Sequence, residues 1–539
     1  MKINILKSLT LIAAVSFATV SCIGNYEEIN QDPYGVTDDE MQRDGYVIRA
    51  SLSGMANGVI SSDVNTTQFT ECLLGGPMAG YMADANAGFS NTISNYNPTD
   101  NWTNVLMYSD RIIPVIYSNY RQLKRVTEDP VILSVAGIIK VAAMHRVTDT
   151  YGPIPYSQIT DDGKIEVPYD SQQKVYETMF SELSAAITVL TENRTNNFAS
   201  SADPVYGGVT EKWVKLANSL KLRLAMRISY ADPALSKKMA EEAVSNEVGV
   251  MTSNSDNALI TTFGTDGNPI NVAVKYNKVP AHADGTACTT DAGDSHAAAD
   301  IIAYMNGYKD PRRSAYFTKS EWEGVDYVGL RHGIVIPNHT SIGHKFSGVK
   351  ITTSDPICWM RASEVAFLEA EAVAVFGYDM KGSAKDFYEK GVELSFDERG
   401  AKGVAAYLAD AESKPQTYTD PSGSNTYSGM ISDITIAWDE AATTEQKQER
   451  IITQKWIANW LLGDESWADV RRTGYPHLIP ATDAGNKSNG EVNSADGARR
   501  MKYPVDEYVN NADNINQAVS NYLKGSDLMS THLWFDCKK

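Results

Sequence analysis

Cysteine is scarce in this chain, and the few cysteines lie far apart. The 539 residues contain five, and no two have the C-x-x-C spacing that zinc sites and redox motifs use. The sequence therefore predicts neither a zinc site nor a disulfide-stapled scaffold. It leaves open one or two bridges in an exported protein, among Cys72, Cys288, Cys358 and Cys537.

Clustered positive charge is also absent. The chain has 48 Lys and Arg against 67 Asp and Glu, a formal net charge of −19, and no run of basic residues. Because binding to phosphate backbones requires grouped Lys and Arg side chains, this composition excludes nucleic acid as a partner. An acidic surface of this kind favours a soluble, monomeric body.

The sequence has none of the common catalytic signatures. It contains no G-x-S-x-G nucleophile elbow, no H-E-x-x-H metal helix and no P-loop, so we expect no enzyme. Two alternatives stay open. One is a surface glycoside hydrolase, because 67 carboxylates can supply a catalytic pair by chance. The other is a metal site, because five histidines fall in a 63-residue stretch, although no two are one helical turn apart: His282, His296, His332, His339 and His344. We expect no cofactor, and a structural calcium stays open without a named site.

Long apolar runs are rare, and the clearest one lies at the N-terminus. Lys2 and Lys7 flank the start of a run from Leu9 to Val20, which ends at a serine before Cys22. A positive start, a short apolar core and a small residue before a cysteine are typical of a bacterial lipoprotein signal. A core of about a dozen residues is too short for a membrane span, which needs about 20. We predict a signal peptide over residues 1–21 and a lipid on Cys22, with an ordinary cleaved signal as the alternative.

The rest of the chain forms one body, residues 22–539. Residues 22–39 are acidic and rich in turn formers, which indicates an extended tether. We expect no later stretch to approach the length of a membrane span. Long polar stretches rich in Gly, Asn, Asp and Ser indicate surface excursions at 195–208, 252–268, 417–428 and 482–497.

Apolar periodicity predicts a helix-dominated fold. Residues 133–147 are apolar nearly all round, which indicates a helix buried on most sides, and Trp213 to Ile228 repeat apolar residues every three or four positions. Further helices are expected at 175–190, 361–376, 383–396 and 445–462. The pair 361–376 and 383–396 is typical of a helical hairpin. Strand-like alternation is confined to 334–336 and 431–436.

Four ordered motifs resemble the SusD/RagB family. They are DTYGPIPY at 149–156, MRASEVAFLEAEA at 360–372, SWADVRRTGYP at 466–476 and RMKYPVDEYVNNADNIN at 500–516. The resemblance covers essentially the whole mature chain. It implies an all-α dominated, tetratricopeptide-like scaffold of helical hairpins with long irregular loops and minor β structure. It further implies a surface-exposed outer-membrane lipoprotein of Bacteroidetes that delivers a glycan, or in some branches a peptide, to a SusC-like TonB-dependent transporter.

These motifs also have a structural interpretation. Gly152 is able to take the positive φ of a helix end, and Pro153 cannot continue the helix. Trp467 is expected to be a packed aromatic. We expect charged residues to lie at the margin of one helix (Arg361, Glu364, Glu371) and to form fixed ion pairs in another (Asp469, Arg471, Arg472). On this interpretation the motifs hold the scaffold rather than touch the ligand.

A ligand surface for sugars needs flat aromatic rings beside hydrogen-bonding side chains. The Gly- and Asn-rich stretch 75–102 offers this mixture, including Phe89, and a second candidate is 316–327. The candidate ligand-binding residues are Tyr81, Tyr96, Asn101, Trp102 and Trp322. The alternative is that these rings pack loops onto the scaffold.

Overall fold

The computed structural model describes residues 45–538, apart from 90, 105, 108–111, 161–163, 165, 283 and 339–341. The chain divides into two compact units, Met1–Ile48 and Arg49–Lys539. The second unit contains all the elements that follow, except for the first residues of α4 (Tyr46–Val59). The predicted signal peptide, Cys22 and the tether lie outside the described residues and stay predictions.

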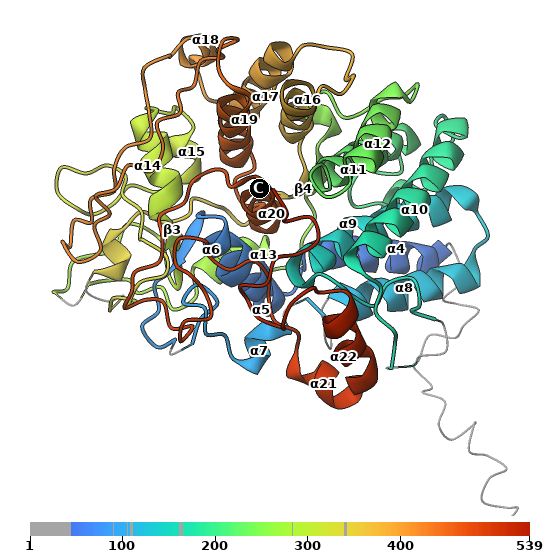
Figure 1. Ribbon diagram of the computed structural model, residues 1–539, viewed down its shortest axis with the longest axis horizontal. Coiled ribbons are helices and arrows are strands. Elements are labelled where there is room, and N and C mark those ends of the chain that lie inside the picture. Colours follow the sequence, from blue (N-terminus) through green and yellow to red (C-terminus); the bar gives the residue numbers. More distant parts are fainter. Residues whose placement is uncertain are drawn as a thin grey trace, which may run out of the picture. The chain divides into compact units, whose positions relative to one another are not determined.

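Helices that follow one another along the chain pack as neighbours. Figure 1 shows α9, α10, α11 and α12 side by side, and each contacts the next. A second group is formed by α16, α17 and α19, in which α16 contacts both of the others. The long helices are α8 (Ile112–Val126), α9 (Pro130–Tyr151), α10 (Gln172–Glu192), α11 (Thr210–Arg227), α12 (Pro233–Ser245), α16 (Ala362–Phe376), α17 (Ala384–Glu398), α19 (Thr444–Ala458) and α20 (Gly463–Thr473). The helical hairpins predicted from periodicity are confirmed, among them α16 with α17.

Local sequence signals set the ends of these helices. Asp129 and Ser171 accept hydrogen bonds from the first turns of α9 and α10, and Thr443 forms a capping box with Gln446 at the start of α19. Helix α9 ends at Gly152, which has a φ of +91°. The positive φ predicted for this glycine is therefore confirmed, since other residues rarely adopt it.

Helix α9 corrects the expectation that no later stretch approaches the length of a membrane span. In the described part of the chain it is the one helix long and apolar enough to cross a membrane, at 22 residues. However, 83% of its most apolar window is buried inside the protein, where it contacts α8, α10 and α20. Its apolar surface therefore belongs to the protein core.

Strands are few and short, and they lie in the irregular part of the fold. Two antiparallel pairs form: β1 (Met82–Asp84) with β3 (Ser295–Ala297), and β2 (Ala258–Ile260) with β4 (Ile357–Met360). The strands predicted at 334–336 and 431–436 are wrong. Their isoleucines, such as Ile334 and Ile436, are buried, but the backbone forms no ladder there.

Short helical turns complete the irregular part. They are α5 (Val64–Thr67), η2 (Gln68–Gly75), α6 (Gly76–Met78), α7 (Asp100–Thr103), η3 (Ser200–Ala202), η4 (Asn254–Asp256), α13 (Pro269–Val274), α14 (Ala299–Gly307), α15 (Arg313–Tyr316), η5 (Gly343–Lys345), α18 (Val404–Leu408), α21 (Val505–Asn510) and α22 (Ala512–Asn521).

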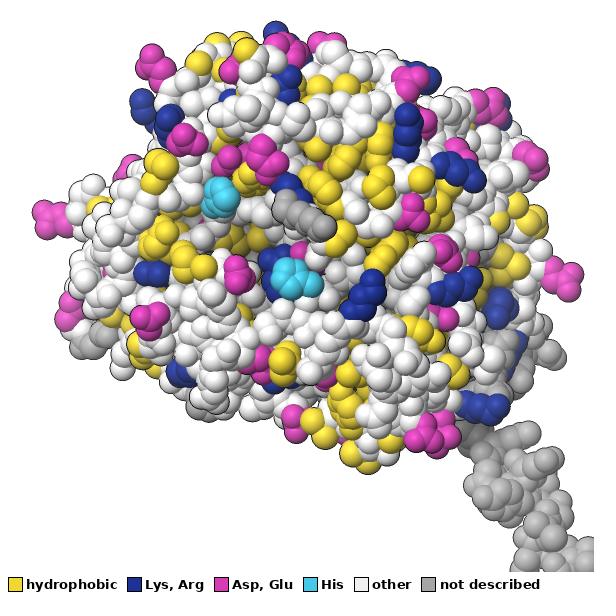
Figure 2. Space-filling view, in the orientation of Figure 1, with side chains coloured by type: hydrophobic (Ala, Val, Ile, Leu, Met, Phe, Trp, Pro, Cys, Tyr) yellow, Lys and Arg dark blue, Asp and Glu magenta, His cyan; other side chains and the backbone are white. Residues whose placement is uncertain are grey.

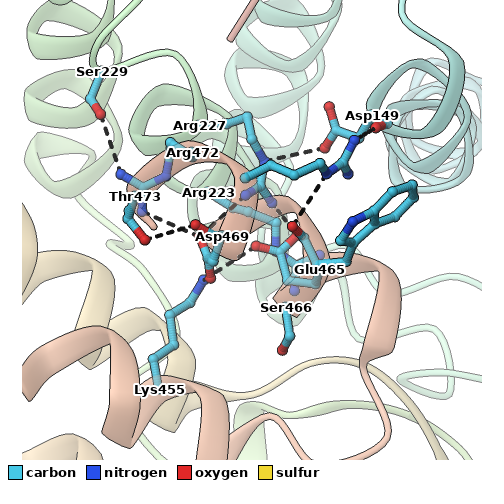
Figure 3. A network of polar contacts seen from close by, with 12 residues as sticks. Asp149, Arg223, Arg227, Ser229, Lys455, Glu465, Ser466, Asp469, Arg472 and Thr473 are labelled. Atoms are coloured by element: carbon cyan, nitrogen blue, oxygen red, sulfur yellow. Dashed lines mark hydrogen bonds and ion pairs between the residues drawn. The ribbon is translucent and has the colours of Figure 1, made fainter. Parts of the chain in front are cut away.

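A buried network of ion pairs joins the helices that carry the sequence motifs (Figure 3). Its centre is Arg227 of α11, whose guanidinium contacts Glu465 at 2.6 Å and Asp149 and Asp469 at 3.2 Å each. Lys455 of α19 contacts Asp469 at 2.5 Å. Burial disfavours the charge on Lys455, but the carboxylates around it outweigh burial and raise its pKa. The network therefore fastens α9, α11, α19 and α20 to one another.

Helix α16 is joined to the same helices by buried acidic residues. Glu364 makes two 2.7 Å bonds with Arg223, and Glu371 makes bonds of 2.7 and 2.8 Å with Arg472. The expectation that the charges of α16 lie at its margin is wrong, because Glu364 and Glu371 are fully buried. The structural interpretation of these motifs is supported, since each of these acidic residues pairs with an arginine from a distant part of the chain.

Glu369 of α16 differs from Glu364 and Glu371. Among the described residues, no side chain forms a hydrogen bond or an ion pair with it. Burial raises its pKa from 4.5 to about 8. The folded state therefore binds this proton more tightly than the unfolded chain does. Its stabilising contribution is fully present below about pH 4.5 and is lost as the pH rises through about 8.

We therefore expect Glu369→Gln to be more stable than the wild type at pH 8, by about 1–3 kcal/mol, and nearly equal to it at pH 5. The amide removes the cost of ionising a buried carboxyl. Melting temperatures of both proteins between pH 5 and pH 8 test this. Parallel curves for the two proteins would show that Glu369 does not titrate in this range.

Candidate ligand-binding surface

Three half-buried aromatic rings gather at Trp102, and we call them the aromatic cluster: Phe69, Phe89 and Trp102. The ring centroids of Phe69 and Phe89 lie 5.3 and 5.5 Å from that of Trp102, and both contacts are edge-to-face. Phe69 comes from η2, Phe89 from the loop after β1, and Trp102 from α7. These two contacts hold the indole in place, which favours a preformed apolar platform.

Polar side chains hold the loops that carry the aromatic cluster. Asn86 and Asn277 donate amide hydrogen bonds to the buried carboxylate of Asp294 at 2.9–3.1 Å, and Gln68 donates one at 3.5 Å. Gln68 precedes Phe69 in the sequence, and Asn86 is three residues before Phe89. These bonds therefore fix the loops through a shared acceptor just before β3.

Asn101 stands beside Trp102 in α7 and is exposed. Its side-chain amide has no hydrogen-bond partner within the described ranges, so it is available to a ligand. An exposed amide next to a half-exposed indole is the combination that a sugar requires, with its apolar ring face and hydroxyl edge. Of the candidate residues, Asn101 and Trp102 therefore lie together at one surface.

Trp322 lies in a separate aromatic contact. Its ring packs against Phe346 with centroids 5.8 Å apart, and the Lys345 ammonium lies 5.3 Å from the ring. The neighbouring Glu321 accepts bonds from the side chain of His282 and from Thr289. Trp322 is half-buried, and its loop is held by these contacts against the segment that leads to β3.

Tyr81 lies in the core. Its ring is fully buried and stacks against Trp456, and its hydroxyl bonds with the Ser466 hydroxyl at 2.7 Å. We therefore leave Tyr81 out of the proposed site, because no ligand can reach it without unfolding the core. Tyr96 is also buried, at 5% exposure, but it lines a cavity described below.

Phe69 is the member of the aromatic cluster that sequence analysis missed. It precedes the Gly-rich stretch 75–102 by six residues and stands inside an apparently helical segment. The one signal that could have found it is the pair Gln68-Phe69, a polar and an aromatic residue next to the loop.

The histidines that the structure describes are not assembled into a metal site. Within the described residues, no group of three or more His, Cys, Asp or Glu could hold a metal ion. His296 and His344 come closest, with ring centroids 5.7 Å apart in the core, and burial lowers the pKa of His296 to about 3. His332 contacts Asp300 at 3.0 Å, and His339 lies outside the described residues.

The four cysteines of the body are all free thiols: Cys72, Cys288, Cys358 and Cys537. Burial raises the pKa of Cys72 and of Cys358, the latter to about 11. Buried thiols of raised pKa are unreactive and behave as small apolar side chains.

The surface carries no basic patch on the face drawn in Figure 2. Lys and Arg side chains are scattered singly there among acidic ones.

A helix-dominated scaffold of stacked hairpins, with an irregular part that presents aromatic rings, defines a class of binding proteins. The chain belongs to the SusD-like family. The family model described as "Susd and RagB outer membrane lipoprotein" matches residues 28–536. The family is one of outer-membrane lipoproteins, and it places the protein at the outer membrane.

Solved structures support this assignment. A SusD homologue from Bacteroides uniformis is 56% identical, with a TM-score of 0.88 over 92% of this chain and 100% of that one. One from Bacteroides ovatus is 41% identical, with a TM-score of 0.83 over 92% and 100%. A chitin-binding SusD homologue from Flavobacterium johnsoniae is 34% identical, with a TM-score of 0.82 over 91% and 99%. Comparison with curated proteins gives no match.

Proposed function

We propose that this protein is a lipid-anchored receptor on the cell surface that binds an oligosaccharide at the aromatic cluster. It then hands the ligand to a SusC-like TonB-dependent transporter in the outer membrane. The observation that carries the proposal is the half-exposed indole of Trp102, fixed by Phe69 and Phe89 with Asn101 beside it. The chitin-binding relative from Flavobacterium johnsoniae supports a sugar as the ligand.

The physical argument for a sugar is the match between the two surfaces. Stacking a pyranose ring on an indole removes apolar area of both partners from water, while the exposed amide of Asn101 can bond with hydroxyls at the ring edge. The indole has few rotatable bonds and is already held by the two phenylalanines, so little conformational entropy is lost on binding. A peptide is the alternative ligand, and a surface glycoside hydrolase is the alternative class.

We expect Trp102→Ala to weaken oligosaccharide binding roughly thirtyfold. A central aromatic residue contributes about 2 kcal/mol or more to binding, and about 1.4 kcal/mol corresponds to a factor of ten. Calorimetric titration with chito-oligosaccharides, followed by a panel of other glycans and peptides, measures this. The matched control is Tyr522→Ala, which removes a 37% exposed ring at the end of α22 and should leave the affinity unchanged.

Thermal melting of the same Trp102→Ala sample separates binding from packing. Loss of a buried tryptophan costs about 3–5 kcal/mol of stability, whereas loss of a surface platform costs much less. A lowered melting temperature with unchanged affinity would assign Trp102 to the scaffold. Tight binding of peptides, with no glycan bound, would favour the alternative ligand.

We expect no hydrolysis of the bound glycan. The site consists mainly of aromatic rings and amides, and the buried carboxylate of Asp294 accepts amide hydrogen bonds from three residues. Incubation of the purified protein with glycan pools should therefore release no new reducing ends. Reproducible release that a single carboxylate substitution abolishes would favour the hydrolase instead.

A further inference from the structure

A cavity of about 240 Å³ lies beside the C-terminal part of α20, and none of the three rings of the aromatic cluster lines it. Its walls come from α20 and from two irregular segments, 476–480 and 494–499, and Tyr96 reaches it from the loop before α7. Pockets for drug-sized ligands measure roughly 300–1,000 Å³, so this cavity has room for a group the size of one sugar ring. The lining mixes apolar surface, including Trp467, with polar side chains.

Arg471 is the unusual residue in this lining. Its side chain is almost fully buried, yet its guanidinium donates only to backbone carbonyls, those of Trp467 at 3.2 Å, of Arg499 at 3.0 Å and of Asp149. Its Nη2 has no hydrogen-bond partner, and it forms no ion pair within the described part of the chain. The ion pair predicted for Arg471 from sequence is therefore missing, although the neighbouring Arg472 has two.

The carboxylates nearest Arg471, Asp149 and Asp536, do not outweigh the burial of its charge. Burial lowers the pKa of Arg471 to about 9, whereas for Arg472 the adjoining carboxylates outweigh burial and raise the pKa. Stacking on Trp467, with 3.7 Å from the guanidinium carbon to the ring centroid, offsets part of the cost of burying this charge. A buried charge without a counterion is costly, so the site favours an anion.

The other charged groups of the lining already have partners or face solvent. Arg499 pairs with Asp536, and His332 pairs with Asp300. His477 is half-exposed, and Asp496 is exposed. Arg471 is therefore the one buried cation of the lining that lacks a counterion among the described residues.

Tyr96 supplies a second hydrogen-bond donor. Its backbone has a φ of +60°, which is rare for a residue with a bulky side chain. Such conformations cluster at ligand sites, where the surrounding structure compensates for the strain. Among the described residues, its hydroxyl has no hydrogen-bond partner, and burial raises its pKa, so the hydroxyl stays a donor.

We propose that this cavity binds the carboxylate of an acidic sugar unit of hexuronate size, with Arg471 as its counterion and the Tyr96 hydroxyl as a hydrogen-bond donor. The planar guanidinium matches a carboxylate in shape as well as in charge. The choice of a sugar rests on the proposed function, while the anionic group follows from the cavity alone. Inorganic sulfate is the alternative anion that could bind beside Arg471.

Calorimetric or NMR titration of the purified mature chain with glucuronate and glucose tests this proposal. The two probes share a ring and differ in the carboxylate. We expect glucuronate to bind at least about tenfold more tightly than glucose, because a charge-assisted bond to a buried cation is lost with the neutral sugar. Equal binding of the two sugars, or no binding of either, would overturn the proposal.

Two substitutions locate the binding. Tyr96→Phe keeps the ring and should weaken glucuronate binding severalfold without lowering the melting temperature, whereas Arg471→Gln should abolish it. If Arg471→Gln does not fold, the comparison of glucuronate with glucose and the Tyr96→Phe variant still test whether the cavity binds the carboxylate. Unchanged glucuronate binding in Tyr96→Phe would overturn the assignment of this cavity.

Two further measurements distinguish an acidic-sugar site from a general anion site and from the aromatic cluster. Inorganic sulfate that displaces glucuronate at equal concentration would show a general anion site and overturn the sugar assignment. Trp102→Ala should weaken binding of neutral oligosaccharides and leave glucuronate binding intact. Unchanged oligosaccharide binding in Trp102→Ala would therefore count against the proposed function alone, and failure of the wild type to prefer glucuronate over glucose would count against the cavity alone.

Discussion

Replacement of Arg227 by methionine should reduce the free energy of unfolding by about 3–5 kcal/mol. The substitution keeps most of the side-chain volume but removes the cation that contacts three buried carboxylates, at 2.6 to 3.2 Å. Asp149 would then lose its ion pair, and Glu465 and Asp469 would keep only the cations of their other pairs, among them Lys455. Urea or thermal unfolding followed by circular dichroism measures the loss.

The matched control is an arginine in an exposed pair. Arg194 contacts Glu247 at 3.0 Å, with 40% and 60% of the two side chains exposed. Exposed pairs of this kind contribute about 0–1 kcal/mol, so Arg194→Met should unfold at nearly the wild-type midpoint. If Arg227→Met is as stable as Arg194→Met, the buried network does not hold the helices together.

Replacement of Cys22 by alanine should abolish lipidation and release the protein from the outer membrane. The acyl chain is attached through the thiol of this cysteine, and alanine offers no such group. Incorporation of labelled fatty acid and fractionation of membranes measure the change. Cys537→Ala, which removes an exposed cysteine of the body, should leave both unchanged. A Cys22→Ala protein that still takes up label and stays with the membranes would contradict the anchor.

Helices were predictable from sequence because apolar periodicity is a local signal. Residues 213–228 repeat an apolar residue every three or four positions, and the structure forms α11 at Thr210–Arg227. The strands predicted at 334–336 and 431–436 do not form. Alternation of apolar residues shows which side chains are buried, but it does not show whether a second strand lies beside them. Four of the five isoleucines in these stretches are indeed buried, namely Ile334, Ile431, Ile434 and Ile436.

The burial of charged residues such as Glu364 was predicted wrongly for a related reason. The sequence around Glu364 shows an acidic residue in an apolar helix, and without a known partner the margin of the helix is the natural place for it. Its partner Arg223 comes from 141 residues earlier in the chain. Pairing of this kind depends on tertiary contacts, which local patterns do not contain.

The candidate site was predicted in part. The mixture of aromatic and amide residues in 75–102 led to Trp102 and Asn101, which lie together at the surface. The same mixture could not separate Trp102 from Tyr81, whose ring stacks against Trp456 from the far end of the chain. Whether a loop aromatic faces solvent or the core is decided by what packs against the loop.

The most direct test of the account is to observe the tryptophans while a glycan binds. The chain has nine tryptophans, so fluorine NMR of protein labelled with 5-fluorotryptophan gives a small set of signals, and the Trp102→Phe variant identifies one of them. We predict that a neutral oligosaccharide shown by calorimetry to bind shifts the Trp102 signal and leaves that of the buried Trp456 in place. Binding that leaves the Trp102 signal unmoved would contradict the aromatic cluster as the ligand site.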